Sequence, residues 1–529
     1  MANAQLFQTT QGKYIPPATA LNAAEAPAYE FSPRHQLAQY AATGCLNATY
    51  YASGEAQLAR VLELCAQVDP AFIAQTAIYC RERGYMKDMP ALLACVLAAK
   101  GAPQLAPVFK RVINNGKMLR NFVQILRSGA TGRKSLGTRP KKLVQAWLNK
   151  ATEAQLLSAA IGNAPSLADV IKMVHPKPAD AWREAFFAWV IGKPHKAEAL
   201  PQAVKDYEQY KLDQTKAVPN VPFQMLTALP LSAEAWAAIA LQGGWQMVRM
   251  NLNTFGRNGV YALPGMTAMI AAKLRDEAAI AKAGVFPYQL MSAYKAASDD
   301  VPFVIREALQ DALESTLSHV PQIEGGVIIC PDVSGSMQSP ASGYRGTVTS
   351  TVRCIDVAAL VSAAMLRTNP EARVIPFEGT VVNVKLNPRD TVMSNAEKLA
   401  AIGGGATSCA APLALLNREN ARANLVIYVS DNESWVDARH GPTETMRQWN
   451  MFKARNPLAR LVCIDCTPNQ TTQAIEREDV LNIGGFSDEV FKIVAAFAAG
   501  QLGAAHWVGE IEAIAVQEAA WAGSSVQEN

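Results

Sequence analysis

Three oxygen-bearing side chains lie within five residues at the end of a predicted strand. Asp332, Ser334 and Ser336 follow the apolar, β-branched run 327–329, whose composition is that of a buried strand. Gly335 gives the turn between the serines its backbone freedom. Ligands of open α/β sheets bind at the carboxyl ends of the strands, and carboxylate and hydroxyl oxygens suit a hard divalent cation such as Mg²⁺. The stretch therefore predicts a cation site.

Two further segments place polar groups at comparable points. Residues 403–407 form a glycine-rich loop that ends in Thr407, and the apolar run 425–429 leads into Ser430 and Asp431. A polar turn after a strand is an alternative explanation of the first motif. A nucleophilic pair of serine hydroxyls is another, although no histidine lies near them in the sequence.

Together the three segments resemble the metal-ion-dependent adhesion site of von Willebrand factor A domains. In that site an Asp-X-Ser-X-Ser motif, a distant Thr and a distant Asp hold one cation and leave a coordination position open. The expected cation is Mg²⁺, with Mn²⁺ or Ca²⁺ as alternatives, and an acidic side chain of a partner protein is the expected occupant of the open position. The resemblance implies as ligands Asp332, Ser334, Ser336, Thr407 and Asp431.

Size and composition indicate a globular protein with several domains. A chain of 529 residues is too long for one hydrophobic core, so about two to four domains are expected. No apolar run is long enough to cross a membrane, the N-terminus has no secretory signal, and the nine cysteines fit a reducing compartment, so a cytoplasmic location is expected. Cys463 and Cys466 form a single Cys-X-X-Cys, for which a buried strand is favoured over a zinc or redox site.

The positive charge is concentrated in one part of the chain. The formal net charge is only +4, yet residues 89–152 contain twelve Lys and Arg and no Asp or Glu. One sign of charge over such a length is typical of a surface that binds a polyanion, and a solvated basic face without a partner is the alternative. The basic span includes the candidate nucleic-acid contacts Lys110, Arg111, Lys117, Arg120, Arg133, Lys134, Arg139, Lys141 and Lys142.

Smaller features beyond this span add three candidate contacts. His175 lies in a proline-rich turn that must leave helix geometry. Arg249 and Arg257 lie in an Asn- and Arg-rich segment, in which Arg249 and Asn253 are expected to share a helix face. A structural role for the histidine, and a polar helix face with a C-cap near Gly256, are the alternatives.

The order of elements predicts a chain of the α and α/β classes. Helices of about 10–14 residues with short connections run to roughly Ser318, which favours an α-solenoid, and strands then alternate with helices as in a doubly wound sheet. We expect a hairpin over 373–386 and a last helix over 506–521. The expected domains are an extended arm (1–30), a helical module (31–324), an α/β domain (325–505) and a C-terminal helix and tail (506–529).

This order, and several local motifs, resemble the Ro ribonucleoprotein family of the bacterial type. In that family a TROVE module of HEAT-like helical repeats precedes a von Willebrand factor A domain. The motifs that carry the resemblance are Gly44 to Leu58 with its Tyr-Tyr pair, Lys87-Asp88-Met89-Pro90, Gly132 to Trp147, His175-Pro176-Lys177-Pro178, Met247 to Gly259 and Pro287 to Tyr294.

The resemblance implies an RNA-binding protein of noncoding-RNA quality control and of RNA decay under stress. It implies a ring of helical repeats, whose hole takes single-stranded 3′ ends of misfolded RNA, while a Y-like small RNA binds the outer surface. Polynucleotide phosphorylase or another exoribonuclease is the implied protein partner.

A cation-dependent protein adaptor without RNA is the competing hypothesis. A helical chaperone linked to metal insertion belongs to the same class. An enzyme is not expected, because the sequence has no Walker loop, no His-Glu-X-X-His and no nucleophile paired with a histidine and a carboxylate.

Overall fold

The computed structural model describes residues 15–44, 46–317, 320–343, 352–436 and 441–517. The chain divides into two compact units. Residues 1–72, 286–292 and 313–514 form one, the sheet unit, and the rest forms the other, the helical unit. The start of the expected arm (1–14) and the end of the expected tail (518–529) lie outside the described residues.

A parallel five-stranded sheet is the centre of the sheet unit. Its strand order is β4-β3-β5-β6-β8, and every neighbouring pair is parallel. The strands β3, β5 and β8 are buried along their whole length, as expected for a sheet covered on both faces. The strands are β3 Val327–Pro331, β4 Arg373–Val374, β5 Leu425–Ser430, β6 Arg460–Asp465 and β8 Val480–Gly484.

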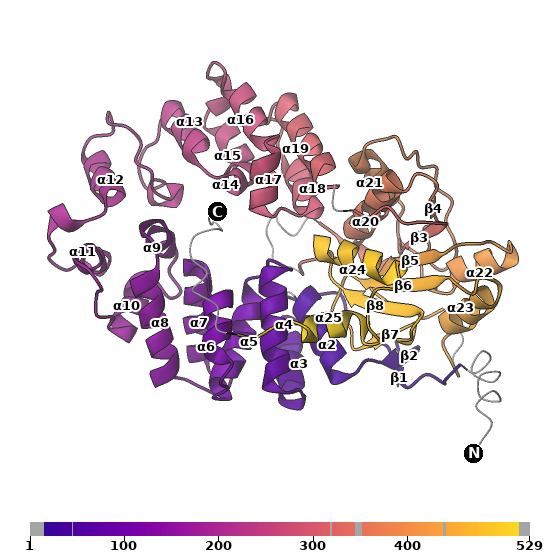
Figure 1. Ribbon diagram of the computed structural model, residues 1–529. Coiled ribbons are helices and arrows are strands. Elements are labelled where there is room, and N and C mark those ends of the chain that lie inside the picture. Colours follow the sequence, from indigo (N-terminus) through magenta and orange to yellow (C-terminus); the bar gives the residue numbers. More distant parts are fainter. Residues whose placement is uncertain (1–14, 45, 318–319, 344–351, 437–440, 518–529) are drawn as a thin grey trace. The chain divides into compact units, whose positions relative to one another are not determined.

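Helices pack on both faces of this sheet (Figure 1). On one face, α22 and α23 bury Trp449 and Phe452 against a row formed by Cys330, Tyr428 and Cys463, which are in register on neighbouring strands. Helices α20 and α24 contact strands β3, β5 and β8. The helices are α20 Cys354–Thr368, α21 Val392–Ala400, α22 Ala411–Arg418, α23 Glu444–Arg455 and α24 Asp488–Ala498.

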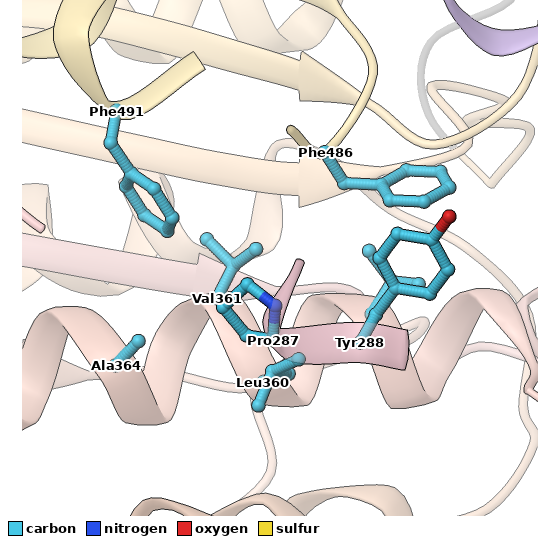
Figure 2. A pocket seen from close by; sticks show the side chains of 8 residues that line it. Pro287, Tyr288, Leu360, Val361, Ala364, Phe486 and Phe491 are labelled. Atoms are coloured by element: carbon cyan, nitrogen blue, oxygen red, sulfur yellow. The ribbon is translucent and has the colours of Figure 1, made fainter. Parts of the chain in front are cut away.

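The start of α18 (Pro287–Ala296), α20 and α24 meet around a small apolar pocket. Figure 2 shows Val361 and Phe491 beside Pro287, with the rings of Tyr288 and Phe486 facing each other. The centroids of those two rings are 4.8 Å apart in an edge-to-face arrangement. These apolar and aromatic contacts explain why residues 286–292 belong to the sheet unit.

The N-terminal region also packs on the α/β domain. Strands β1 (Ala20–Leu21) and β2 (Pro27–Glu30) extend β7 (Thr471–Thr472) into a second, antiparallel sheet. Helix α2 (Pro33–Thr43) and the last described helix, α25 (His506–Glu512), both contact β8. The limits of the sheet unit therefore differ from the expected domain boundaries at residues 30 and 324. The N-terminal strands and α2 cover a sheet edge and a strand, and so they bury backbone that the α/β domain alone would leave open.

Short helices make up the helical unit, as the sequence predicts. Polar N-caps begin many of them and left-handed residues end several, as Asn115 and Gly129 (φ 88°) do for α7. α5 packs against α6 and α7, α7 against α9, and α8 against α10. Helix α3 (Gly54–Gln67) belongs to the sheet unit. The helices that lie wholly or mainly in the helical unit are α4 Pro70–Glu82, α5 Asp88–Ala99, α6 Leu105–Val112, α7 Gly116–Ser128, α8 Thr138–Lys150, α9 Glu153–Ala159, α10 Leu167–Val174, α11 Ala181–Val190, α12 Gln202–Leu212, α13 Ala233–Gln242, α14 Trp245–Met250, α15 Leu252–Arg257, α16 Met266–Leu274, α17 Glu277–Ala283 and α19 Phe303–Thr316.

Three local expectations are wrong. The expected hairpin over 373–386 is only the two-residue β4 and a single bridge between Phe377 and Val381. The last helix ends at Glu512, and the described residues that follow, 513–517, are not helical. The segment 245–257 is broken at Asn251, so Arg249 and Asn253 lie on different helices. None of the helices in the described part of the chain combines the length and apolar character that crossing a bilayer requires.

His35, a buried histidine of α2, packs against α25 and makes the stability of the sheet unit depend on pH. His35 stacks on Phe31 with ring centroids 4.1 Å apart and meets Trp507 edge-on. Burial lowers the pKa of His35 to about 3. Below about pH 6.5 His35 is therefore protonated in the unfolded chain but stays neutral in the folded protein. The free energy of unfolding decreases as the pH falls from there.

We predict that His35→Phe, which keeps a stacking ring, flattens this loss. Between about pH 6.5 and 4 the free energy of unfolding of the variant should fall less steeply, by up to ~1.4 kcal/mol per pH unit. Urea unfolding at a series of pH values measures it, with His195→Gln at an exposed histidine as the control. Equal slopes for the variant and the parent would contradict the assignment.

Candidate functional site

The three polar segments singled out by the sequence meet at the carboxyl ends of β3 and β5. The backbone N–H of Gly335 donates to Gly405 O at 3.0 Å, and that of Gly404 donates to Val333 O at 3.2 Å, so the glycine-rich loop lies on the Asp-X-Ser-X-Ser turn. Asp431 follows β5, the strand next to β3. The five expected cation ligands are nearly inaccessible, with exposed fractions of 0% for Asp332 and Ser334, 7% for Ser336, and 2% for Thr407 and Asp431.

Hydrogen bonds hold the first ligands in place. Asp332 Oδ1 accepts the backbone N–H of Ser334 at 2.8 Å, and Asp332 Oδ2 accepts the hydroxyl of Ser430 at 2.6 Å. The hydroxyl oxygens of Ser334 and Ser336 are 3.4 Å apart. No histidine bonds either serine among the described residues, so this arrangement favours cation ligands over a nucleophile with a base.

The electrostatics of the site call for positive charge. Burial raises the pKa of Asp332, and burial together with the charge of Asp332 raises the pKa of Asp431 to about 7. Glu433 is raised to a pKa of about 8 by burial and by Asp431. The described charged groups that act on Asp431 and Glu433 are thus other carboxyls. A bound divalent cation would stabilise all three carboxylates.

The donor set fits a hard cation better than zinc. The described residues contain no group of three or more His, Cys, Asp and Glu side chains arranged to hold a metal ion, so a site here depends on the hydroxyls of the two serines and of Thr407. Hydroxyl and carboxylate oxygens, completed by water, are the ligands of Mg²⁺.

Several residues that form hydrogen bonds around Asp431 were not predicted from the sequence. Asn469 Nδ2 donates to Asp431 O at 2.9 Å, and Glu433 Oε2 accepts the backbone N–H of Ala23 at 2.8 Å. Asn22 Nδ2 donates to Ser434 O at 2.7 Å. The polar run after Asp431 was a visible signal for Glu433, but no pattern in the sequence could show that the N-terminal arm reaches this loop.

Tyr51 is a second N-terminal residue at the site. Its phenol is half-buried, and burial with the nearby charge of Asp431 raises its pKa. The segment that carries it is fastened by Asn47 Nδ2, which donates to Ser342 O at 3.1 Å, and by Gln57 Nε2, which donates to Asn47 O at 2.7 Å. The Tyr-Tyr motif therefore belongs to the surroundings of the candidate cation site.

In the helical unit, two arginines of the basic span form hydrogen bonds that stabilise the fold. Arg133 donates to Ala98 O at 2.9 Å, and Arg139 donates to Ala102 O at 2.8 Å and to Pro103 O at 2.9 Å. Both arginines therefore satisfy carbonyls at the C-terminal end of α5 and just beyond it.

Two more arginines are also engaged. Arg111 donates to both carboxylate oxygens of Glu82, at 2.7 and 2.6 Å, and to Ala515 O at 2.6 Å. Arg120 packs against Gly162, where a Cβ atom would lie 2.2 Å from Nη1, and burial lowers its pKa.

The lysines of the span are the more accessible group. Lys117, Lys134 and Lys142 are exposed, and Lys110 and Lys141 are half-buried. Exposed ammonium groups can reach phosphates, whereas the engaged guanidinium groups must first give up protein partners. Among the candidate RNA contacts of this span, the lysines are therefore better placed to bind phosphates than the arginines.

Residues of α8 fix the turn that displays His175. Gln145 Nε2 donates to Val174 O at 2.6 Å, and Asn149 Nδ2 donates to Lys177 O at 2.8 Å. His175 caps α10 in the left-handed conformation (φ 49°) and is exposed. Lys141 and Lys142 precede Gln145 by one helical turn and so share its face of α8.

We call Lys141, Lys142, His175 and Lys177 the basic turn surface. Lys177 is exposed and was not among the expected contacts, although the His-Pro-Lys-Pro motif contained it. The two halves come from the basic span and from the proline-rich turn, which are more than 30 residues apart in the sequence. Folding thus joins two of the features that the sequence singled out separately.

The Arg- and Asn-rich segment does not form the expected shared face. Asn253 Nδ2 donates to Ala296 O at 2.8 Å, and its Oδ1 accepts Ser298 N at 2.9 Å, which makes it a structural residue. Arg249 is half-buried and donates to Gln246 Oε1 at 2.8 Å, while Arg257 is exposed on α15.

Comparison with known proteins identifies relatives of this chain. Residues 327–498 match the family model described as the Ro60 vWA domain. Over 511 residues the chain is 25% identical to the RNA-binding protein RO60 of Deinococcus radiodurans, covering 90% of this chain and 94% of that one. Neither name is that of an enzyme, in agreement with the expectation from the sequence.

A solved structure shows the same fold. The crystal structure of the Deinococcus radiodurans Ro (Rsr) protein matches with a TM-score of 0.63 at 22% identity, over 89% of this chain and 100% of that one. The expected fold class, a helical module followed by a doubly wound von Willebrand factor A domain, is thereby confirmed. The resemblance to the Ro ribonucleoprotein family is supported as well: residues 327–498 match the Ro60 vWA domain model, on a chain similar to a bacterial Ro protein over nine-tenths of its length.

Proposed function

We propose that this protein binds RNA through the helical unit. The observation that carries the proposal is the basic turn surface, in which a turn held by Gln145 and Asn149 presents His175 and Lys177 beside the lysines of α8. The similarity to a protein named for RNA binding supports it.

The chemistry of this surface suits phosphates more than bases. Lysine ammonium groups neutralise phosphates and release counterions, which gives affinity with little dependence on sequence. The backbone of the turn is held by hydrogen bonds, so little conformational entropy is lost when a strand binds. We propose single-stranded 3′ ends of misfolded noncoding RNA and a Y-like small RNA as ligands, an exoribonuclease such as polynucleotide phosphorylase as a partner, and RNA quality control under stress as the role.

We further propose that the sheet unit holds one divalent cation, Mg²⁺ first, through Asp332, Ser334, Ser336, Thr407 and Asp431. Bound there, the cation supplies a Lewis-acidic docking point for a carboxylate of a partner protein, with water at its remaining positions. Support comes from buried carboxyls whose pKa values are raised by burial and by one another. If the protein captures partners by this cation and binds no RNA, the adaptor hypothesis takes the place of the first proposal.

For RNA binding we predict that Lys142→Glu combined with Lys177→Glu weakens affinity by about tenfold or more. Each lost phosphate contact should also reduce the salt slope of single-strand binding by about 0.7. Filter binding over a salt titration measures both, with a structured small RNA carrying a single-stranded 3′ tail and the same RNA blunt-ended.

The matched control reverses two charges elsewhere. Lys398→Glu with Lys492→Glu changes the net charge equally but alters exposed lysines of the sheet unit. Arg139→Gln should lower the stability of the helical unit more than it changes the salt slope, because it removes the hydrogen bonds to the carbonyls of Ala102 and Pro103 just after α5. Equal RNA affinity for the basic-turn variant and the parent would show that RNA binds elsewhere.

For the cation we predict a pH dependence that Mg²⁺ abolishes. Without a cation, the raised pKa of Asp431 means that the folded protein binds more protons than the unfolded chain between about pH 4 and 7. Stability should therefore fall as the pH rises through that range, and Mg²⁺ at ~100 times its Kd should restore roughly 2.7 kcal/mol above pH 7. Thermal unfolding in EDTA and in Mg²⁺ measures this.

Asp431→Asn should reduce the loss in EDTA, since Asp332 and Glu433 still contribute to it, and should remove the gain from Mg²⁺. Asp390→Asn, at a surface carboxylate paired with Lys398, is the control and should leave both unchanged. A gain from Mg²⁺ that survives in the Asp332→Asn, Asp431→Asn double variant would place the cation at another site.

A further inference from the structure

A loop of the N-terminal region lies against the candidate cation site, within the sheet unit. Its residues are 46–53, and we call it the tyrosine loop. The backbone N–H of Thr49 donates to Ala52 O at 2.8 Å and so closes the tip that carries Tyr50 and Tyr51. The loop is therefore a hydrogen-bonded turn with two aromatic side chains at its tip.

The two tyrosines have different surroundings. Tyr50 is 59% exposed, whereas Tyr51 is half-buried, and their ring centroids are 4.8 Å apart in an edge-to-face arrangement. The Tyr51 hydroxyl is hydrogen-bonded to the side chain of Ser336 and lies close enough to Asp431 to feel the charge of that carboxylate. Tyr51 thus reaches two of the five expected cation ligands.

Ser336 connects the phenol to the deeper ligands. Its hydroxyl oxygen is 3.4 Å from that of Ser334, and its side chain also bonds the carboxylate of Asp431. With an exposed fraction of 7%, Ser336 is the least buried of the five expected ligands. The phenol of Tyr51 therefore covers the site at the point where it comes nearest to solvent.

We propose that Tyr51 closes the candidate cation site on the side where the carboxylate of a partner would enter. A coordination position that takes a ligand from another protein must be reachable from solvent, yet none of the five expected ligands is more than 7% exposed. A carboxylate can enter only after the tyrosine loop has moved. This inference rests on the proposed cation site and adds to it a residue that controls access.

The chemistry of a phenol suits a reversible cover. A tyrosine hydroxyl both donates and accepts hydrogen bonds, and it is uncharged near neutral pH, so it adds no negative charge to the buried carboxyls. Mg²⁺ prefers carboxylate oxygens over a neutral phenol. The acidic side chain of a partner can therefore displace Tyr51, whereas an apolar side chain gains nothing from doing so.

The anchor of the tyrosine loop is separate from this contact. Asn47 Nδ2 donates to Ser342 O at 3.1 Å, and Gln57 of α3 donates to Asn47 O at 2.7 Å. Ser342, like Ser336, belongs to the segment that follows β3. A substitution at Asn47 should therefore loosen the loop without altering the phenol.

Water relaxation by bound Mn²⁺ tests the closure, because it reports water that exchanges at an open position of the ion. Tyr51→Ala should raise this relaxation by about twofold or more over the parent. Acetate, as a probe for a carboxylate, should then lower it in Tyr51→Ala but not in the parent. Tyr50→Ala removes the exposed neighbouring ring and is the matched control, which should behave as the parent does.

A second variant covers the case in which Tyr51→Ala does not fold. Asn47→Leu keeps both tyrosines but removes the side-chain bond to Ser342, so it should also raise the relaxation and make it sensitive to acetate. If Mn²⁺ binds but every folded variant relaxes water as the parent does, the closure is overturned.

Hydrogen exchange separates the closure from the cation itself. In EDTA, Tyr51→Ala should speed the exchange of the backbone N–H groups of residues 333–337 by about tenfold, and Tyr50→Ala should not. If Mn²⁺ binds to neither the parent nor the variants, the cation proposal fails. Faster exchange in Tyr51→Ala then still supports the cover, and exchange equal to that of the parent overturns it.

Discussion

The sheet unit depends on carboxyls that are buried next to one another. Parallel strands bring Asp332, Asp431 and Asp465 to one edge of the sheet, and burial raises the pKa of each. Such a cluster persists only if its oxygens receive hydrogen bonds or a cation. Ser430 donates to Asp332, and Gln39 and Asn469 bond the side chain of Asp465, which provides part of this compensation. The need of these carboxyls for hydrogen bonds explains why hydroxyl and amide side chains gather at the carboxyl ends of otherwise apolar strands.

The same constraint accounts for the N-terminal arm. Glu433 Oε2 accepts a backbone N–H from Ala23, and Gln39 of α2 reaches Asp465, so residues about 400 positions earlier satisfy the carboxyls. Strand β2 covers the edge of β7 in the same region. An isolated fragment that begins near residue 325 would therefore lose hydrogen bonds at the candidate cation site, and the cover of a sheet edge. The α/β domain is contiguous in sequence, but its stability is not confined to it.

Local sequence predicted much of this molecule, and the failures have physical causes. Strand ends are visible because an apolar run stops at Asp332 or Asp431, and the loop around Thr407 is visible by its glycines. The break at Asn251 was missed because the tertiary bonds of Asn253 to Ala296 and Ser298 outweigh helix periodicity. Contacts of Tyr51 and Ala23 with the candidate cation site could not be predicted, since no local pattern records which distant loop a segment will meet.

The basic span shows how the two cationic side chains divide their work. The planar guanidinium presents several N–H groups in a fixed arrangement, and Arg133 and Arg139 use it to bind carbonyls around the end of α5. Lysine has a single mobile ammonium group and does not serve such a cap as well. Lys117, Lys134 and Lys142 accordingly stay exposed. A surface whose free charges are mainly lysines attracts phosphates without the bidentate geometry by which arginine reads guanine. The proposed RNA contacts at this surface therefore favour backbone phosphates over base sequence.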